Sequence, residues 1–137
     1  MKRGFACGVF DLFHAGHVLM LEECRQHCDY LIVAVNKAES ISSEINPGKK
    51  KPLYSLDDRM LILSSCKFVD EVVDYNGEEE LLQLLKKMQV HIRFLGEDYK
   101  GKPITGDNLN IEIHYTDRSH GKSSSWFKEQ LKTANNL

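Results

Sequence analysis

Short apolar runs alternate with amphipathic stretches along almost the whole chain. Runs typical of strands lie at residues 3–9, 30–35, 71–74, 92–95 and 111–115. The run at residues 30–35, YLIVAV, is apolar at nearly every position, which is typical of a strand buried on both faces of a parallel sheet. Helical spacing of apolar residues predicts helices at residues 16–26, 55–66, 77–89 and 123–132.

The expected order of elements is β-α-β-α-β-α-β-β-α, which predicts an α/β fold. We expect one domain, residues 1–137, built as a Rossmann-like, doubly wound parallel sheet in a three-layer α/β/α arrangement. Ligands of such sheets bind beyond the carboxyl ends of the strands. Residues 36–54 are polar and predict a long loop, which we expect to be mobile without ligand and to order over it.

The loop after the first strand carries the most informative chemistry. It reads GVFDLFHAGH and contributes Gly8, Val9, Phe10, Asp11, His14, Gly16 and His17 as candidate site residues. His14 and His17 are three residues apart where a helix begins, so their rings should point the same way. A helix N-terminus favours phosphate, and two imidazoles there can donate hydrogen bonds to phosphate oxygens. A zinc site that includes Asp11 and a purely structural histidine pair remain alternatives.

Composition narrows the class of protein only slightly. The chain is 42% hydrophobic and 28% charged, with a net charge of -2, so a nucleic-acid partner is not expected. We expect no membrane segment and no signal peptide, and therefore a cytoplasmic protein. The four cysteines form no CxxC pair and are interpreted as reduced thiols, with a metal site at Cys24, Cys28 and a histidine as the alternative.

Four segments together resemble one family. GVFDLFHAGH resembles the GxFDxxHxGH signature of the cytidylyltransferase-like nucleotidyltransferases, in which HAGH matches the HxGH motif. SLDDRMLILSSCKFVDEVV, FLGEDYKGK and DRSHGKSSSWFKEQL resemble three later segments of the same family. In length and order the chain is most similar to the small bacterial glycerol-3-phosphate cytidylyltransferases. The resemblance implies transfer of a nucleoside monophosphate, with CTP favoured as donor, to a small phosphorylated acceptor such as glycerol 3-phosphate, with release of pyrophosphate and with Mg²⁺ accompanying the triphosphate.

The resemblance also implies roles for individual residues. His14 and His17 would contact the triphosphate and stabilise the transition state, assisted by Arg118 and by a lysine of the polar loop, Lys49 or Lys51. The other implied nucleotide contacts are Arg59, Gly96, Asp98, Ser123, Ser124 and Ser125. Surface ion pairing for Arg59, a surface position for Asp98 and simple helix capping by the serines remain open. Trp126 is interpreted as a packing residue, and the family precedent predicts a homodimer built around residues 66–72.

Two departures from the family pattern leave the substrate open. Lys122, Ser123, Ser124 and Ser125 stand where the family has ISTT, and NKAE follows the second strand where an Asp is common. ATP or CTP as donor therefore remain candidates, as do sugar phosphates, phosphoethanolamine, phosphocholine and a flavin precursor as acceptor. A non-catalytic nucleotide-binding module is the alternative of another class, against which the intact HxGH motif and Arg118 argue.

Overall fold

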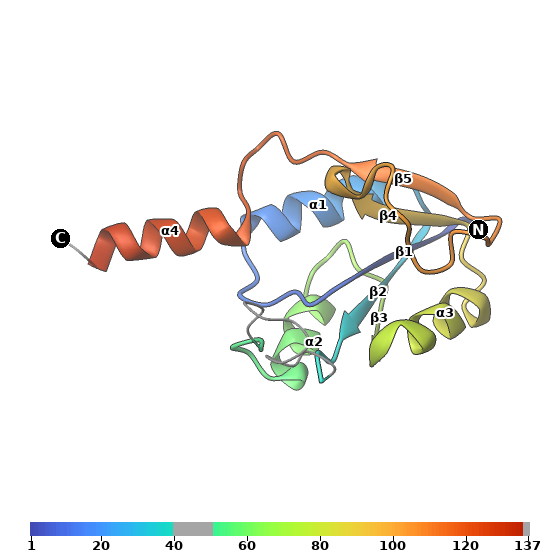
Figure 1. The fold of residues 1–137 in the computed structure, drawn as a ribbon, viewed down its shortest axis with the longest axis horizontal. Coiled ribbons are helices and arrows are strands. Elements are labelled where there is room, and N and C mark those ends of the chain that lie inside the picture. The colour runs from blue at the N-terminus through green and yellow to red at the C-terminus, as the bar shows by residue number, and fades with distance from the viewer. Residues whose placement is uncertain (40–50, 136–137) are drawn as a thin grey trace.

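A five-stranded parallel sheet forms the centre of the computed structural model, which describes residues 1–39 and 51–135 (Figure 1). Its strands are β1 (Arg3–Gly8), β2 (Tyr30–Asn36), β3 (Glu71–Tyr75), β4 (Ile92–Gly96) and β5 (Glu112–Thr116). The helices are α1 (Ala15–Gln26), α2 (Leu56–Ser64), α3 (Gly77–Lys87) and α4 (Ser124–Asn135), and a short 3₁₀ turn, η1, spans Glu97–Tyr99. The predicted order of elements is confirmed.

The sheet has the strand order β3-β2-β1-β4-β5, with every pairing parallel. From β1 the chain first moves outward through β2 and β3, and then returns to pair β4 on the other side of β1. The switch point therefore lies between β1 and β4, where the loops that follow these two strands diverge. This is the doubly wound α/β fold expected from the sequence.

Two apolar layers hold helices on opposite faces of the sheet. Alternate strand residues such as Ala6 and Val33 pack with Leu21 of α1 and Leu63 of α2. The intervening positions pack on the other face, against α3. The side chains of β2 from Leu31 to Val35 are fully buried, which explains the unbroken apolar run in the sequence.

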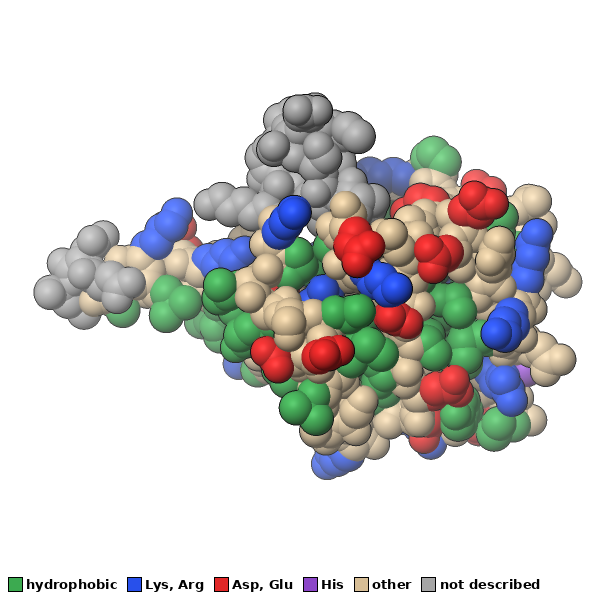
Figure 2. Space-filling view, turned by 90° about the horizontal axis from the view of Figure 1, so that it is seen from below, with side chains coloured by type: hydrophobic (Ala, Val, Ile, Leu, Met, Phe, Trp, Pro, Cys, Tyr) green, Lys and Arg blue, Asp and Glu red, His purple; other side chains and the backbone are tan. Residues whose placement is uncertain are grey.

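Helix α4 departs from the layered arrangement, because it extends away from the sheet instead of covering a face (Figure 1). Two of its apolar residues are consequently open to solvent: Trp126 is 46% exposed and Leu131 is 61% exposed. Trp126, which the sequence suggested as a packing residue, packs edge to face on Phe127 at 4.8 Å but does not belong to the buried core. Figure 2 shows hydrophobic side chains along this projecting helix, and acidic and basic side chains intermixed over the main body on the same face.

None of the helices in residues 1–39 and 51–135 has the length and apolar character needed to cross a membrane. The four cysteines are free thiols, and two of them are buried beside α1. Cys24 donates to the sulfur of Met20, and Cys28 donates to the carbonyl of Cys24. Within the described ranges, no three His, Cys, Asp or Glu side chains are grouped to hold a metal ion.

Candidate active site

The loop between β1 and α1 is held in an unusual backbone conformation. Phe10 and Leu12 have positive φ angles of 54° and 49°, which cost non-glycine residues of order 1–3 kcal/mol each. Phe10 compensates by burying its ring in the core. The strained turns place Asp11 between them, and strain of this kind persists only where the surrounding structure fixes it.

Asp11 connects this loop to the segment that precedes α2. Its carboxylate accepts hydrogen bonds from the amides of Leu53 and Tyr54, at 2.8 and 3.0 Å. Burial alone would raise the pKa of Asp11, but the hydrogen bonds from the Tyr54 and Leu53 amides outweigh burial and hold the pKa below its usual range. Asp11 therefore acts as an ionised anchor between two loops at the carboxyl edge of the sheet.

The two histidines of the HAGH segment cap the first turn of α1. His14 is the N-cap residue, and its Nδ1 accepts from the amide of Gly16 at 3.0 Å. In return, Nδ1 of His17 accepts from the amide of His14 at 3.1 Å. This reciprocal arrangement is a capping box built from imidazoles instead of the usual hydroxyl and carboxylate.

The capping box fixes the chemistry that each ring presents. Because both Nδ1 atoms accept hydrogen bonds from backbone amides, a neutral ring must carry its proton on Nε2. The ring centroids lie 4.0 Å apart, so the two Nε2–H donors belong to one cluster. The Nε2 of His14 lies 3.0 Å from the hydroxyl oxygen of Ser124.

Burial and neighbouring charges keep both rings neutral. Desolvation, with further contributions from His14 and Arg118, lowers the pKa of His17 to about 4. Burial and the nearby His120 also lower the pKa of His14. His17 stacks at 5.2 Å on the ring of Phe13, which contributes to its dry environment. Near neutral pH the pair therefore offers hydrogen-bond donors without carrying net charge.

The segment that leads into α4 lies directly against these histidines. The ring of Phe127 packs 4.5 Å from that of His14, and the carbonyl of Lys122 covers Gly16. A Cβ on Gly16 would lie only 1.8 Å from this carbonyl oxygen, so no larger residue fits here. Helix α1 and the segment before α4 thus form two walls of one site.

A cavity of about 450 Å³ lies between these walls, a volume typical of small-molecule sites. It is lined by His14, Gly16, His17, Met20, Asp117, Arg118, His120, Gly121, Lys122, Ser123, Ser124 and Ser125. The guanidinium of Arg118 lies over Gly96, and its Nη1 is 3.8 Å from a carboxylate oxygen of Asp98. Two neutral histidines, two cationic side chains and several hydroxyls make a site suited to a phosphorylated anion.

A family model described as cytidylyltransferase-like matches residues 5–127, which include the whole of this cavity. The chain belongs to the cytidylyltransferase-like family. The family expected from the sequence is therefore confirmed. So is the expected enzyme class, at the level of the family.

Relatives of this cytidylyltransferase-like chain fall into two kinds. It is 34% identical to glycerol-3-phosphate cytidylyltransferase of Bacillus subtilis, over 96% of this chain and 98% of the relative. It is 36% identical to the bifunctional protein HldE of Campylobacter concisus, over 96% of this chain but only 27% of the relative. The chain thus spans about a quarter of the length of the HldE proteins that it matches.

A solved structure with the same fold is the lipopolysaccharide core biosynthesis protein of Thermoplasma volcanium. It superposes with a TM-score of 0.69 at 26% identity, covering 85% of this chain and 97% of that one. The agreement supports the Rossmann-like assignment made from the sequence.

The cavity brings together many of the residues expected from the cytidylyltransferase-like motifs. Gly16, both histidines, Arg118 and the three serines line it, and Gly96 and Asp98 lie beside the Arg118 guanidinium. Ser123 also caps α4, because its hydroxyl accepts from the amide of Trp126 at 3.1 Å. Capping and cavity lining are therefore compatible here.

Arg59 has a different environment from the phosphate contact expected. It is only 3% exposed, and its guanidinium donates to the carbonyls of Val9, Asn36, Lys37 and Tyr54. These carbonyls belong to the loops after β1 and β2 and to the segment before α2. The observed role of Arg59 is to fasten the three segments together.

The remaining expected residues fall outside the cavity. Gly8 ends β1 with the ring of Phe10 against it, and the Val9 carbonyl is bound by Arg59. Lys51 is exposed, while Lys49 and most of the expected mobile loop lie outside the described residues.

Five residues of the lining were not selected from the sequence: Met20, Asp117, His120, Gly121 and Lys122. Four of them belong to the segment between β5 and α4. The sequence signal that pointed toward them was the resemblance of the segment DRSHGKSSSWFKEQL to the family, because this segment contains all four. Met20 gave none, because one apolar residue on a helix is ordinarily a core residue.

Proposed function

We propose that the chain transfers a cytidylyl group from CTP to a small phosphorylated acceptor, for which glycerol 3-phosphate is the first candidate. An oxygen of the acceptor phosphate attacks the α-phosphorus of the triphosphate. The bond from that phosphorus to the bridging oxygen breaks, and pyrophosphate leaves with the electron pair. The full-length match to a glycerol-3-phosphate cytidylyltransferase supports this choice.

One observation carries the proposal: His14 and His17, whose mutual capping leaves the proton of each neutral ring on Nε2, line the same cavity as Arg118. Fixed donors of this kind stabilise charge that develops on phosphate oxygens without reorganising during the reaction. Phosphoryl transfer depends mainly on such positioning and charge neutralisation, so no protein nucleophile is required. We assign the transition-state contacts to His14, His17 and Arg118, and we assign contacts with the nucleotide to Ser124, Ser125 and Lys122.

We further propose that Mg²⁺ enters bound to the triphosphate. Asp11, the carboxylate of the histidine loop, already uses both oxygens to accept backbone amides. Asp117, the carboxylate that lines the cavity, uses both oxygens to accept from Ser119. The donor set therefore does not fit a cage made by the protein, and phosphate oxygens with water are the usual ligands of this ion. The proposed roles of the histidines and Arg118 do not depend on it.

We propose that the working protein is a homodimer in the cytoplasm. The family precedent implies an interface around residues 66–72, and Leu61, which is close to them in sequence and 66% exposed, is an apolar side chain that a second copy would cover. The four free thiols fit a reducing compartment. Size-exclusion chromatography with light scattering tests the dimer, and a mass near the 15.7 kDa of one chain would contradict it.

The activity is tested by pyrophosphate release with each of the four triphosphates against a panel of phosphorylated acceptors. CTP with glycerol 3-phosphate is expected to give the highest kcat/KM, and a sugar phosphate preferred over it would correct the acceptor. The His17→Asn variant should lower kcat by about 10²-fold or more, because it removes one fixed donor. His91→Asn is the matched control, because His91 caps the start of β1 far from the cavity. Turnover unchanged in His17→Asn would refute the assignment.

A further inference from the structure

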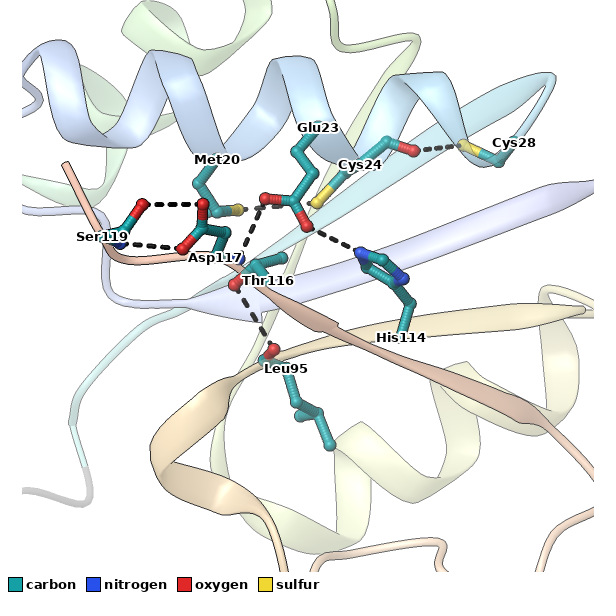
Figure 3. Close-up of polar contacts among 9 residues, drawn as sticks. All are labelled: Met20, Glu23, Cys24, Cys28, Leu95, His114, Thr116, Asp117 and Ser119. Atoms are coloured by element: carbon teal, nitrogen blue, oxygen red, sulfur yellow. Dashed lines mark hydrogen bonds and ion pairs between the residues drawn. The ribbon is translucent and has the colours of Figure 1, made fainter.

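A carboxylate on α1 connects that helix to the end of β5. Oε1 of Glu23 accepts a hydrogen bond from the amide of Asp117 at 2.9 Å, and Oε2 accepts one from Nε2 of His114 at 2.6 Å (Figure 3). The side chains of Glu23 and His114 are only 22% and 27% exposed. Both oxygens of one carboxylate are thus bound to the same strand end, which gives the connection a defined geometry.

The residue fixed by this contact directly precedes Arg118. The Asp117 carboxylate accepts both the amide and the hydroxyl of Ser119, each at 2.8 Å (Figure 3). These bonds hold the pKa of Asp117 below its usual range, so its carboxylate stays ionised. The backbone is therefore restrained on both sides of Arg118, with the preceding amide tied to α1 and the following residue tied to Asp117.

Two further contacts hold the carboxyl end of β5. The hydroxyl of Thr116, which is 2% exposed, donates to the carbonyl of Leu95 in β4 at 3.3 Å. The ring of His114 packs 4.0 Å from that of His27, the C-cap residue of α1. Neither contact involves a residue beyond 116. Among the hydrogen bonds of the described residues, the one that joins α1 to Asp117 comes from Glu23.

Helix α1 therefore positions residues of the cavity in two ways. Its N-terminus orients the donors of His14 and His17, and two turns later Glu23 sets where the Arg118 segment leaves the sheet. Groups that act together need their relative positions fixed to within about 0.5 Å, which supporting hydrogen bonds provide. One rigid helix would then set the geometry of all three groups.

We propose that Glu23 is a positioning residue that holds Arg118 in register with the two histidines, and that His114 orients the Glu23 carboxylate for this task. The proposal rests on the proposed nucleotidyl transfer at the cavity. It requires that loss of the Glu23 contact impair function through Arg118, and not through general destabilisation.

Three variants test the contact. Glu23→Ala should lower kcat/KM by about 10- to 100-fold, mostly through kcat, since small misplacements at a reacting centre have effects of this size. Glu23→Gln should retain activity within about threefold of wild type, because its amide oxygen can still accept the Asp117 amide and its NH₂ can donate to the other tautomer of His114. Glu22→Ala is the matched control, since Glu22 is the exposed neighbour on the same helix.

A double-mutant cycle separates positioning from stability. If Glu23 acts through Arg118, then Glu23→Ala should have an effect of less than about twofold in an Arg118→Ala background. The cycle is measured on kcat/KM and also on the Kd of CTP, determined by isothermal titration calorimetry. Independent, multiplying effects in both measurements would overturn the proposal. So would a Glu23→Ala variant with normal kcat and Kd but a lowered Tm.

The two readouts also separate this proposal from the proposed function. Absence of turnover in the wild-type protein with every triphosphate and acceptor would refute nucleotidyl transfer. Coupling between Glu23 and Arg118 in the Kd of CTP would still support the positioning role in that case. Its absence there, or a failure of the wild type to bind CTP, would refute that role.

Discussion

Replacing Gly16 by alanine is expected to separate the two walls of the cavity. An ideal Cβ at this position lies 1.8 Å from the carbonyl oxygen of Lys122 and 2.8 Å from Cε1 of His14. Carbon and carbonyl oxygen approach each other to about 3.3 Å, so the Lys122 carbonyl must move by about 1.5 Å. The obstacle is backbone, which cannot rotate away as a flexible side chain could.

The size of the effect follows from what moves. Residues 121–123 are exposed, so the stretch that carries the Lys122 carbonyl can shift outward at little cost in folding free energy. A typical overpacking cost of about 1–3 kcal/mol is therefore an upper limit for the loss of stability. The shift would break the 3.0 Å contact between His14 and Ser124 and displace Arg118. A displacement above 1 Å at the reacting groups predicts a loss of about 10²-fold or more in kcat/KM.

Steady-state pyrophosphate release and urea unfolding, measured on the same preparations, check this expectation. Gly101→Ala is the matched control, because Gly101 has a φ of 75° and no atom within 4 Å of its ideal Cβ. The Gly101→Ala variant places an alanine in the left-handed backbone region, which is strained, but its Cβ makes no clash at the cavity. A Gly16→Ala variant with the kcat/KM of the wild type would show that the position of the Lys122 segment does not matter for turnover. A stability loss well above 3 kcal/mol would contradict the idea that this segment moves freely.

Three further expectations follow from individual contacts. His17 has a folded pKa of about 4 against an ordinary value of 6.5, so its contribution to stability is present above pH 6.5 and is lost as the pH falls toward 4. The wild type should therefore lose about 3 kcal/mol more unfolding free energy than His17→Asn between pH 6.5 and pH 4. Urea titrations at each pH measure this difference, and the same pH profile in both proteins would contradict it. Ser124→Ala should lower kcat/KM by about 3- to 10-fold in the pyrophosphate assay by removing the hydroxyl that His14 contacts, while a normal value would make that contact incidental. Arg59→Met should reduce the unfolding free energy by about 3 kcal/mol, because it leaves several buried carbonyls without a donor, and a loss below 1 kcal/mol would show that those loops are held elsewhere.

The fold was predictable because its signals are local and agree with one another. The apolar run of β2 and the amphipathic stretches of α1, α2 and α3 each predict their own element, and alternation predicts a parallel sheet. The N-cap at Ser55 is equally local, because its hydroxyl accepts a hydrogen bond from the amide of Asp58 at 3.1 Å. The motif residues His14 and His17 could be placed on the same grounds.

The long-range contacts could not be predicted in this way. Nothing local in Arg59 distinguishes a phosphate contact from a guanidinium bound to carbonyls of three separate segments. The apolar positions of α4 predict a helix, but periodicity does not say which surface covers them. Likewise, the pairing of Glu23 with Asp117 joins residues 94 apart in sequence and depends on where β5 ends relative to α1.

The capping role of the histidines explains why neutral rings suit this site. A protonated Nδ1 could not accept an amide hydrogen, so protonation of either ring would break part of the cap that orients it. The positive end of α1 and the nearby Arg118 also oppose charge on His17. Lys122 and Arg118 can meet the net charge of a triphosphate, which leaves the histidines to supply directed N–H donors. A lysine in place of either histidine would add charge but lose both the cap and the direction. We therefore expect His17→Lys to be at least as impaired in kcat as His17→Asn, and a His17→Lys variant that is clearly more active would show that charge matters more than direction.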